Sequence, residues 1–423
     1  MTRVKPRILS MILSSLTEND RSETILFIVY ILPFTTSILH FIKALSSLNP
    51  RLFPVLNKKI SIKVQEEHSK GRNPLDIIED IARSLHNPLL NRILSTYSFI
   101  ARNVGSGTIA TLSFFEKAVE AVSDAWERFT GFMKLSLEIY VVITVMAILG
   151  LMLSIMNPSS MNYLYIIPLA VVWMLIASII GNNVLQPPIG NPFNAFKPAK
   201  TMTILGYIAL VTCMTITLYD PYLATIAGLT CIAGGLYIEY NAYVLEKKYT
   251  LFLDGLSAVN NSLQAGYPSS PQIRETVVRH GIQGKLRDLL MLLSESAALT
   301  GEIGLRQSFK YVVETVNKGF KEYKKLKYTV LLYVAVTLVA SILYLYAFNT
   351  IESAGWNSLH KTLSNNRVSC TLKHVYSELV LRMAVFSASA SPIAVFASYR
   401  GRLPPILVSG IGLIGLQLVA HPL

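Results

Sequence analysis

Residues 135–156 read LSLEIYVVITVMAILGLMLSIM, an apolar stretch whose one charged side chain is Glu138. A helix of about 20 apolar residues crosses a hydrocarbon core of about 30 Å. Six similar stretches follow, and each must be helical because backbone polar groups cannot stay unpaired in lipid. The sequence thus predicts an all-α, polytopic membrane protein with seven transmembrane helices, at 135–156, 163–183, 202–219, 222–240, 328–349, 378–398 and 403–421.

The composition of the whole chain argues against a soluble enzyme. Of the 423 residues, 52% are hydrophobic and 15% are charged, whereas about 25% of an ordinary soluble protein is charged. The three cysteines lack the spacing of metal ligands, and neither GxxxxGK[ST] nor HExxH occurs in the chain. We interpret Gly105-Ser-Gly107 as a turn. We therefore expect no catalytic residue, no metal and no cofactor.

The positions of Lys and Arg predict the orientation, because cytoplasmic loops retain these residues. Residues 1–134 hold 17 of them, 184–201 hold 2, 244–327 hold 13 and 399–402 hold 2, whereas 350–377 hold 3. We therefore expect a protein of the cell membrane with a cytoplasmic N-terminus. Seven spans then place the C-terminus outside.

The apolar run 25–45 allows two interpretations. It is nearly long enough to be an eighth span, but Pro33, Thr35, Thr36, Ser37 and His40 put polar groups and a helix breaker in its middle. A buried helix of a soluble bundle has the same composition. We favour the bundle helix, and the membrane span stays open.

Two segments are too polar for a bilayer and too long for loops, so they are predicted to be cytoplasmic helical domains. The resulting organisation is an N-terminal tail 1–22, cytoplasmic domain 23–134, four transmembrane helices within 135–243, cytoplasmic domain 244–327, and three transmembrane helices within 328–423 with an external loop 350–377.

The two cytoplasmic segments resemble each other. Shifted by 194 positions, GTIATLSFFEKAVEAV (107–122) overlies GEIGLRQSFKYVVETV (301–316) with six identities. An apolar stripe continues to Trp126/Phe320 and Phe129/Tyr323, and a duplicated structural unit suits a scaffold better than an active site. For Glu120 and Glu314, which occupy equivalent positions, we favour a solvated helix face over a contact with a partner. The identical pairs are Gly107/Gly301, Ile109/Ile303, Phe115/Phe309, Val119/Val313, Glu120/Glu314 and Val122/Val316.

Local motifs accompany this repeat. FLDGLSAV (252–259) and LQAGYPS (263–269) predict a helix and then a Gly-Pro turn that starts another helix, and TGEI (300–303) precedes a long helix rich in Lys. The counterparts in the first domain are NPLL (87–90), the turn at 105–107 and LSLEIY (135–140). Two amphipathic helices, Leu89–Asn103 and Leu286–Leu299, precede the repeated helices.

With these motifs and this order of segments, the chain resembles the type II secretion system F domain family, most of all its archaeal branch. The resemblance implies the membrane platform of an archaeal archaellum or type IV pilus assembly machine. Such a platform has no chemistry of its own. It acts as a homodimer, docks a cytoplasmic hexameric secretion ATPase, and couples the motion of that ATPase to extraction of pilin-like subunits from the bilayer.

Two basic clusters are candidates for ATPase docking, because complementary charge adds on-rate and orientation at an interface. Juxtamembrane lysines also meet anionic lipid, at about 1 kcal/mol each, so both interpretations stay open. The loop between the repeated helices is as good a docking candidate as the cluster that begins at Lys318. No nucleic-acid partner is expected. The alternative function is a polytopic transporter with regulatory repeats, although the middles of the predicted spans are Leu, Ile, Val and Ala. The docking candidates are Lys58, Lys59, Lys63, Lys70, Arg72, Lys318, Lys321, Lys324, Lys325 and Lys327.

Overall fold

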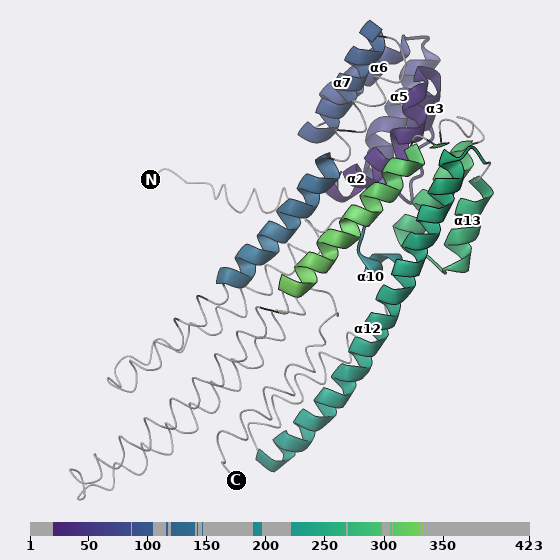
Figure 1. Cartoon of the computed structure of the whole chain (residues 1–423). Coiled ribbons are helices and arrows are strands. Elements are labelled where there is room, and N and C mark those ends of the chain that lie inside the picture. The colour runs from purple at the N-terminus through teal and green to yellow at the C-terminus, as the bar shows by residue number, and fades with distance from the viewer. Residues whose placement is uncertain are drawn as a thin grey trace, which may run out of the picture. The chain divides into compact units, whose positions relative to one another are not determined.

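The computed structural model of the chain (Figure 1) is all-α over the residues that it describes. No strand occurs among them, in agreement with the predicted fold class. The described residues are 20–85, 87–104, 120–139, 189–196, 221–267, 270–297, 305–306 and 308–329, with the single positions 116, 142, 146 and 332.

Contacts divide the chain into two compact units. The predicted cytoplasmic segments contribute together to the first unit, and so does the connection between two predicted membrane hairpins. The predicted spans fall almost entirely in the second unit. The first unit comprises Met1–Thr130, Asn183–Pro198 and Leu245–Lys325, and the second comprises Gly131–Asn182, Ala199–Val244 and Leu326–Leu423.

The segment predicted at 23–134, which we term the first segment, is built around helix α2 (Asp20–Ile31). Every residue from 23 to 35 is buried, on all sides of the helix. A helix that is apolar all round is stable only where it is enclosed, and α2 contacts both α3 (Ile38–Ser46) and α4 (Pro54–Leu56). Phe27 at its centre packs edge-on against Phe53, with ring centroids 6.1 Å apart. The apolar composition of α2 is thus that of a helix in the core of a bundle.

The run 25–45 does not form one helix of membrane length. Helix α2 ends at Ile31, the 3₁₀-helix η1 covers Leu32–Thr36 with Pro33 in its first turn, and Ser37 is extended before α3 begins. The 12 residues of α2 rise about 18 Å, well short of a hydrocarbon core of about 30 Å. Of the two interpretations, the buried bundle helix is the one that agrees with the structure.

A buried carboxylate joins α2 to the next element. Glu23 is only 2% exposed, and its Oε2 accepts hydrogen bonds from the backbone N–H of Val55 at 3.0 Å and of Leu56 at 2.9 Å. These N–H groups belong to the first turn of α4, which continues into the π-helix η2 (Asn57–Ser61) and α5 (Ile62–Ser69). The first turn of a helix has no intrahelical acceptors, so Glu23 satisfies it from a distant part of the chain.

Two Asn-Pro-Leu sequences start the next pair of helices. Asn73 Oδ1 accepts from Leu75 N at 3.0 Å at the start of α6 (Pro74–Ser84), and Asn87 Oδ1 accepts from Leu89 N at 3.1 Å at the start of α7 (Pro88–Val104). Asparagine is a preferred N-cap, and proline is favoured directly after it. Helices α6 and α7 pack together, and α7 confirms the amphipathic helix predicted at Leu89–Asn103.

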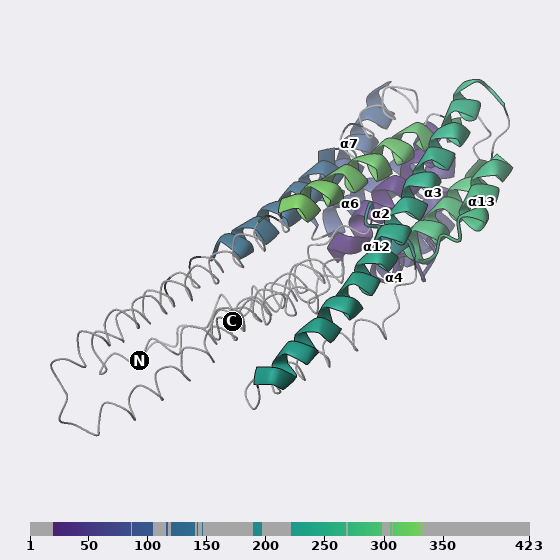
Figure 2. The same cartoon turned by 60° about the horizontal axis from the view of Figure 1, so that its bottom comes forward.

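Helix α12 (Pro221–Gln264) leads into the segment predicted at 244–327, which we term the second segment. It is an uninterrupted helix of 44 residues that Figures 1 and 2 both show as a single rod. Gly266, with a φ of +92°, ends it, and α13 (Ser270–Arg279) follows. This is the helix, turn and helix that the motifs at 252–269 predict. Residues 284–297 are also helical, so the predicted amphipathic helix Leu286–Leu299 is confirmed as far as 297.

The apolar stripe of the predicted repeat agrees with burial in both copies. Helical residues 120–139 bury Val122, Trp126 and Phe129, and the helical residues 308–329 bury the equivalent positions of the second copy, Val316, Phe320 and Tyr323. Phe309 is also fully buried. Gly107, Gly301 and Phe115 lie outside the described residues.

Most of the predicted spans lie outside the described residues. Span 222–240 lies in α12, but most of its side chains belong to the part that is not described, as do nearly all residues of the other six spans. Within the described part of the chain, no helix combines the length and the apolar character needed to cross a membrane.

Candidate functional site

The first basic cluster lies on η2, α5 and the turn that follows α5. Arg72 donates to Glu67 Oε2 and to Asp80 Oδ2, each at 2.8 Å. Lys70 Nζ lies 2.7 Å from Glu67 Oε1, and Lys63 Nζ donates to the Asp80 carbonyl at 3.3 Å. Lys63, Lys70 and Arg72 are therefore engaged within their own bundle. Lys58 and Lys59 are exposed on η2.

The contribution of Glu67 to the stability of the fold depends on pH. The hydrogen bond from Lys70, followed by that from Arg72, lowers the pKa of Glu67 to about 2. A depressed pKa stabilises the fold above the ordinary value of 4.5, and this contribution is lost as the pH falls towards 2. Since both cationic partners of Glu67 are exposed side chains, the effect is small. We expect Glu67→Gln to lower Tm at pH 7 by on the order of 1 °C.

Thermal unfolding of the full chain in detergent between pH 2 and 7 checks this expectation. The Tm values of wild type and Glu67→Gln should converge as the pH falls, because the wild type loses what the variant already lacks. Glu66→Gln, which changes the exposed neighbouring carboxylate, serves as the control. A Tm difference between wild type and Glu67→Gln that stays constant down to pH 2 contradicts the assignment.

The second basic cluster lies on the helical residues 308–329. One face of this helix is buried, and the other carries exposed Lys321, Lys324 and Lys325 with half-buried Lys318 and Lys327. Lys324 Nζ lies 4.5 Å above the centre of the Phe320 ring, a cation–π contact, and Lys325 pairs with Glu322. These cations thus lie along the solvent face of a helix whose other face belongs to the core.

The exposed charge of this helix is not part of the repeat. At the positions equivalent to Lys318 and Lys321, the first copy has Asp124 and Glu127, and the positions equivalent to Lys324, Lys325 and Lys327 are Thr130, Gly131 and Met133. The two copies therefore share their buried stripe and differ in the charge of their exposed face. Since the fold does not require these lysines, they are candidates for a role in binding.

Glu120 and Glu314, the paired acids of the repeat, are both exposed. Lys310 Nζ lies 4.0 Å from Glu314 Oε1, one helical turn away. Pairs of this kind on a solvated helix face contribute little. The solvated-face interpretation of the two glutamates agrees with their exposure.

Residues 189–196, which we term the strap, form a junction that the sequence does not predict. The strap contains the short helix α10 (Pro192–Ala195), and its described side chains and glycine are buried, including Ile189, Asn191 and Phe196. The carbonyl of Ala195 accepts a hydrogen bond of 2.7 Å from Gln283 N, in the turn after α13. The strap is therefore attached to the second segment.

Two glycines allow the strap to approach the helical residues 308–329 at backbone distance. Gly190 has a φ of +93°, and a Cβ on it would lie 2.4 Å from the carbonyl carbon of Gly319. A Cβ on Gly319 would in turn lie 2.9 Å from the Ile189 oxygen and 3.0 Å from Trp126 Nε1. Only residues without a Cβ fit such an approach. The strap thus meets helices of both repeat copies at one point.

Aromatic rings surround this contact. Tyr249 of α12 lies between Phe196 of the strap, with ring centroids 6.3 Å apart, and Phe320, at 5.0 Å. Burial raises the pKa of the Tyr249 hydroxyl, and the Gly190 backbone beside it acts in the opposite direction. The junction therefore ties the strap, α12 and the helical residues 308–329 into one apolar cluster.

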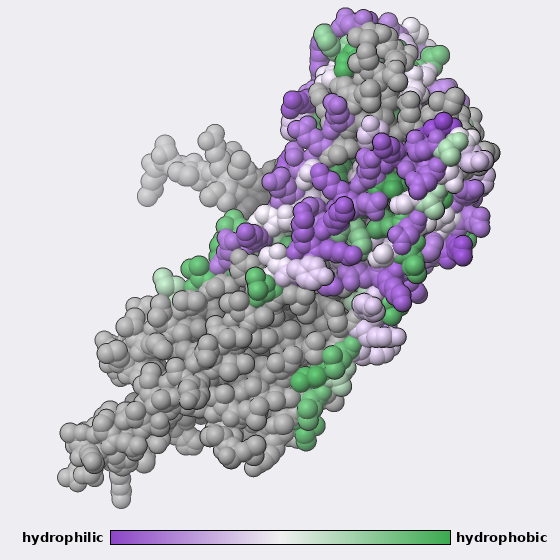
Figure 3. Space-filling view, in the orientation of Figure 1, coloured by the Kyte–Doolittle hydropathy of each residue, from purple (hydrophilic) through white to green (hydrophobic). Residues whose placement is uncertain are grey.

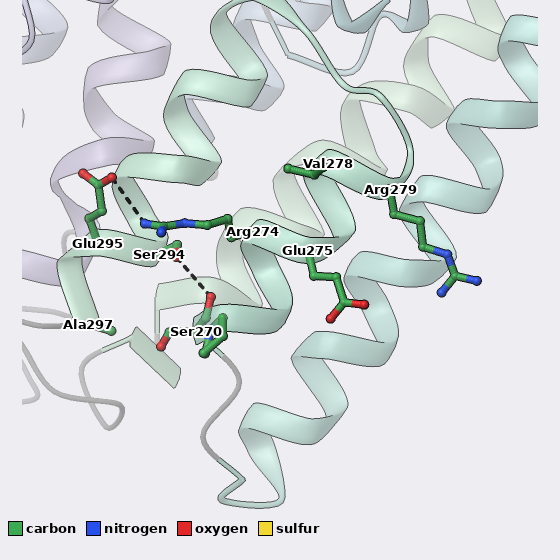
Figure 4. A pocket seen from close by; sticks show the side chains of 9 residues that line it. Ser270, Arg274, Glu275, Val278, Arg279, Ser294, Glu295 and Ala297 are labelled. Carbon is green, nitrogen blue, oxygen red and sulfur yellow. Dashed lines mark hydrogen bonds and ion pairs between the residues drawn. The ribbon is translucent and has the colours of Figure 1, made fainter.

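A groove of about 890 Å³ lies between α13 and the helical residues 284–297 (Figure 4). Arg274 and Glu295 point towards one another across it, 3.5 Å apart, and Ser294 Oγ donates to the Ser270 carbonyl at 3.0 Å. Its described lining includes no histidine that could activate either serine. The residues present form an open surface of mixed charge.

The strap was not predicted, because the number of Lys and Arg residues in the connection between the predicted spans indicates orientation and not packing. Residues 184–196, VLQPPIGNPFNAF, contain no charged side chain and are rich in Pro and large apolar groups. A solvated cytoplasmic loop of this length is usually polar. The absence of charge was the available signal for packing. Among the described residues, no group of three or more His, Cys, Asp or Glu is placed to hold a metal ion.

Comparison of the chain with known proteins gave no match to a protein-family model, to a curated protein or to a solved structure.

Proposed function

We propose that this chain is the membrane platform of a machine that assembles filaments of the type IV pilus and archaellum class. In this role it acts as a homodimer, docks a cytoplasmic hexameric secretion ATPase, and couples the motion of the ATPase to extraction of pilin-like subunits from the bilayer. The proposal rests on the sequence resemblance described above.

One structural observation carries the coupling function. Helix α12 passes from the predicted span 222–240 into the bundle without a break, over 44 residues or about 66 Å. A continuous helix transmits a displacement along its axis, which a flexible linker does not. The helical residues 308–329 likewise run to the start of the predicted span 328–349. Movement of the bundle would therefore reach the membrane through two helices.

The proposed docking surface uses cations of the two basic clusters that lie away from the predicted span 328–349. Lys63, Lys70 and Arg72 bind acceptors of their own bundle. We place the proposed contacts to the ATPase at exposed Lys58, Lys59 and Lys321 and at half-buried Lys318. Lys324, Lys325 and Lys327 lie closer to the predicted span 328–349. A lipid surface competes with the ATPase for these three.

We expect charge reversal of Lys58, Lys59, Lys318 and Lys321 to glutamate to abolish filament assembly. Recovery of the ATPase with the tagged platform should fall at least about tenfold, because like charges at an interface repel and slow association. The amount of the platform in the membrane fraction should not change. Filaments counted by electron microscopy and the ATPase quantified by immunoblot give the two readouts.

The matched control is Asp124→Lys with Glu127→Lys, at the first-copy positions equivalent to Lys318 and Lys321. This control also reverses exposed charge on a repeat helix, and it should leave assembly intact. Normal filaments in the four-residue variant would remove these lysines from the docking surface.

A further inference from the structure

The exposed stripe of α12 changes its chemistry in a regular order along the helix. Its aliphatic part is followed by three tyrosines one turn apart and then by two exposed lysines, and each of the apolar side chains is exposed over more than half of its surface. In Figure 3 apolar atoms follow the lower part of α12, whereas the surface of the bundle is mostly hydrophilic. The stripe consists of Ile226, Leu229, Leu236, Tyr237, Tyr240, Tyr243, Lys247 and Lys248.

The spacing of this stripe matches the layers of a bilayer. At 1.5 Å per residue, Tyr237 to Tyr243 covers about 9 Å, and Lys247 lies about 27 Å from Leu229. The polar interface on each side of the hydrocarbon core is about 5–8 Å thick. Tyrosine concentrates in that interface, and lysine concentrates just beyond it on the cytoplasmic side. The order aliphatic, aromatic and cationic is therefore that of a helix leaving a membrane.

The helical residues 308–332 that are described repeat this order in the opposite direction. Exposed Lys324 and Lys325 precede half-buried Lys327, then exposed Tyr328 and finally exposed Leu332. Lys327 Nζ lies 5.8 Å from the centre of the Tyr328 ring. Two helices of opposite direction thus carry the same sequence of surface chemistry.

Lys247 and Lys248 of α12 lie at the same height along the bundle as Lys324 and Lys325 of the helical residues 308–329. Tyr249 and Phe320 pack against one another with ring centroids 5.0 Å apart. Lys247 and Lys248 come directly before Tyr249, and Lys324 and Lys325 come one turn after Phe320. Because the helices are antiparallel, these four lysines lie on the same side of the aromatic contact. Among the described side chains next to these lysines in the sequence, the acids are Glu322, which pairs with Lys325, and Glu246, which is buried.

We propose that Lys247, Lys248, Lys324 and Lys325 form a basic collar that binds the phosphate groups of anionic phospholipids at the cytoplasmic face of the membrane. This inference rests on the membrane placement in the proposed function. The tyrosines at helical spacing on the apolar side favour a lipid surface over an acidic protein, since aromatic side chains anchor helices in the headgroup region. Lysine binds phosphate as a mobile point charge, which suits a fluid surface.

The test measures lipid binding by the full chain in detergent. Phosphatidylglycerol or phosphatidylcholine is titrated into the protein, and the bound lipids are counted by native mass spectrometry. A lysine near an anionic surface contributes about fivefold in binding. We expect wild type to prefer phosphatidylglycerol, and substitution of all four collar lysines by glutamine to weaken phosphatidylglycerol binding at least about tenfold.

The control removes the same charge elsewhere on the exposed surface, with Lys58, Lys59, Lys285 and Arg287 each replaced by glutamine. It should keep the preference of wild type. Equal binding of both lipids by wild type, or an unchanged preference in the collar variant, would overturn the inference. If the collar variant keeps its lipid preference and no longer recovers the ATPase, the collar is a protein contact instead.

The lipid titration contains no ATPase, so its outcome is independent of filament assembly. Failure of the proposed function while the collar variant loses its preference would leave a lipid-binding membrane protein of another role. Release of wild type from native membranes by alkaline carbonate would instead remove the membrane placement on which both proposals depend.

Discussion

Replacing Gly190 with valine is expected to detach the strap from the second segment. The φ of +93° at this position is a strained conformation for a β-branched residue, at about 1–3 kcal/mol. The new side chain would also overlap the backbone of Gly319, where a Cβ has only 2.4 Å. Overpacking of this kind costs about 1–3 kcal/mol more. Together they give about 2–6 kcal/mol, enough to favour a released strap.

Hydrogen exchange of the full chain measures this release. Amides of residues 189–196 and 308–325 should lose protection by at least about thirtyfold, which corresponds to 2 kcal/mol. Gly71→Val is the matched control, since Gly71 has a φ of +73° and nothing within 4 Å of a Cβ. It shares the conformational strain but not the overlap, and it should leave these amides protected. Wild-type protection in Gly190→Val would show that the strap is not held by this contact.

Replacing Phe27 with alanine is expected to destabilise the first bundle by about 3–5 kcal/mol. Phe27 is fully buried at the centre of α2 and packs against Phe53. The substitution leaves a cavity that the surrounding helices fill only in part. Phe99→Ala is the control, because Phe99 is 69% exposed, and it should cost less than about 1 kcal/mol.

Pulse proteolysis of the full chain in urea, with detection of fragments from residues 20–104, reports this difference in free energy. The result also separates the two interpretations of the run 25–45. If the run 25–45 crossed the membrane, Phe27 would face lipid and its truncation would leave no cavity. Phe27→Ala would then cost no more stability than Phe99→Ala. Equal stability of the Phe27→Ala and Phe99→Ala variants would contradict the buried position of α2.

Features that depend on local sequence could be predicted. The apolar stripe predicted the buried helix faces at Trp126 and Phe320, because the helical spacing of apolar residues can be read from the sequence alone. The turn at Gly266 and the helix start at Asn87 also follow from local chemistry, since glycine and Asn-Pro have fixed roles at helix ends. Lys58 and Lys321, two of the docking candidates, are exposed, and their role in docking stays a prediction.

Features that depend on distant contacts could not be predicted. Glu23 satisfies the first turn of α4 from more than 30 residues away, and nothing in the neighbouring sequence indicates that pairing. The strap needs Gly190, Gly319 and Trp126 to meet, although they come from three separate segments. Arg72 likewise pairs with Glu67 and Asp80, contacts that its place in the sequence does not indicate. In each case tertiary packing decided the role of the side chain.

We propose that this chain is a platform for an ATPase and pilin-like subunits. Purification of the tagged full chain from its native membranes in mild detergent, followed by mass spectrometry of the proteins that accompany it, tests this claim most directly. The platform account predicts recovery of a hexameric secretion ATPase together with pilin-like subunits. Recovery of the chain alone, with a Tm that rises on addition of small solutes, would contradict the account and favour a transporter.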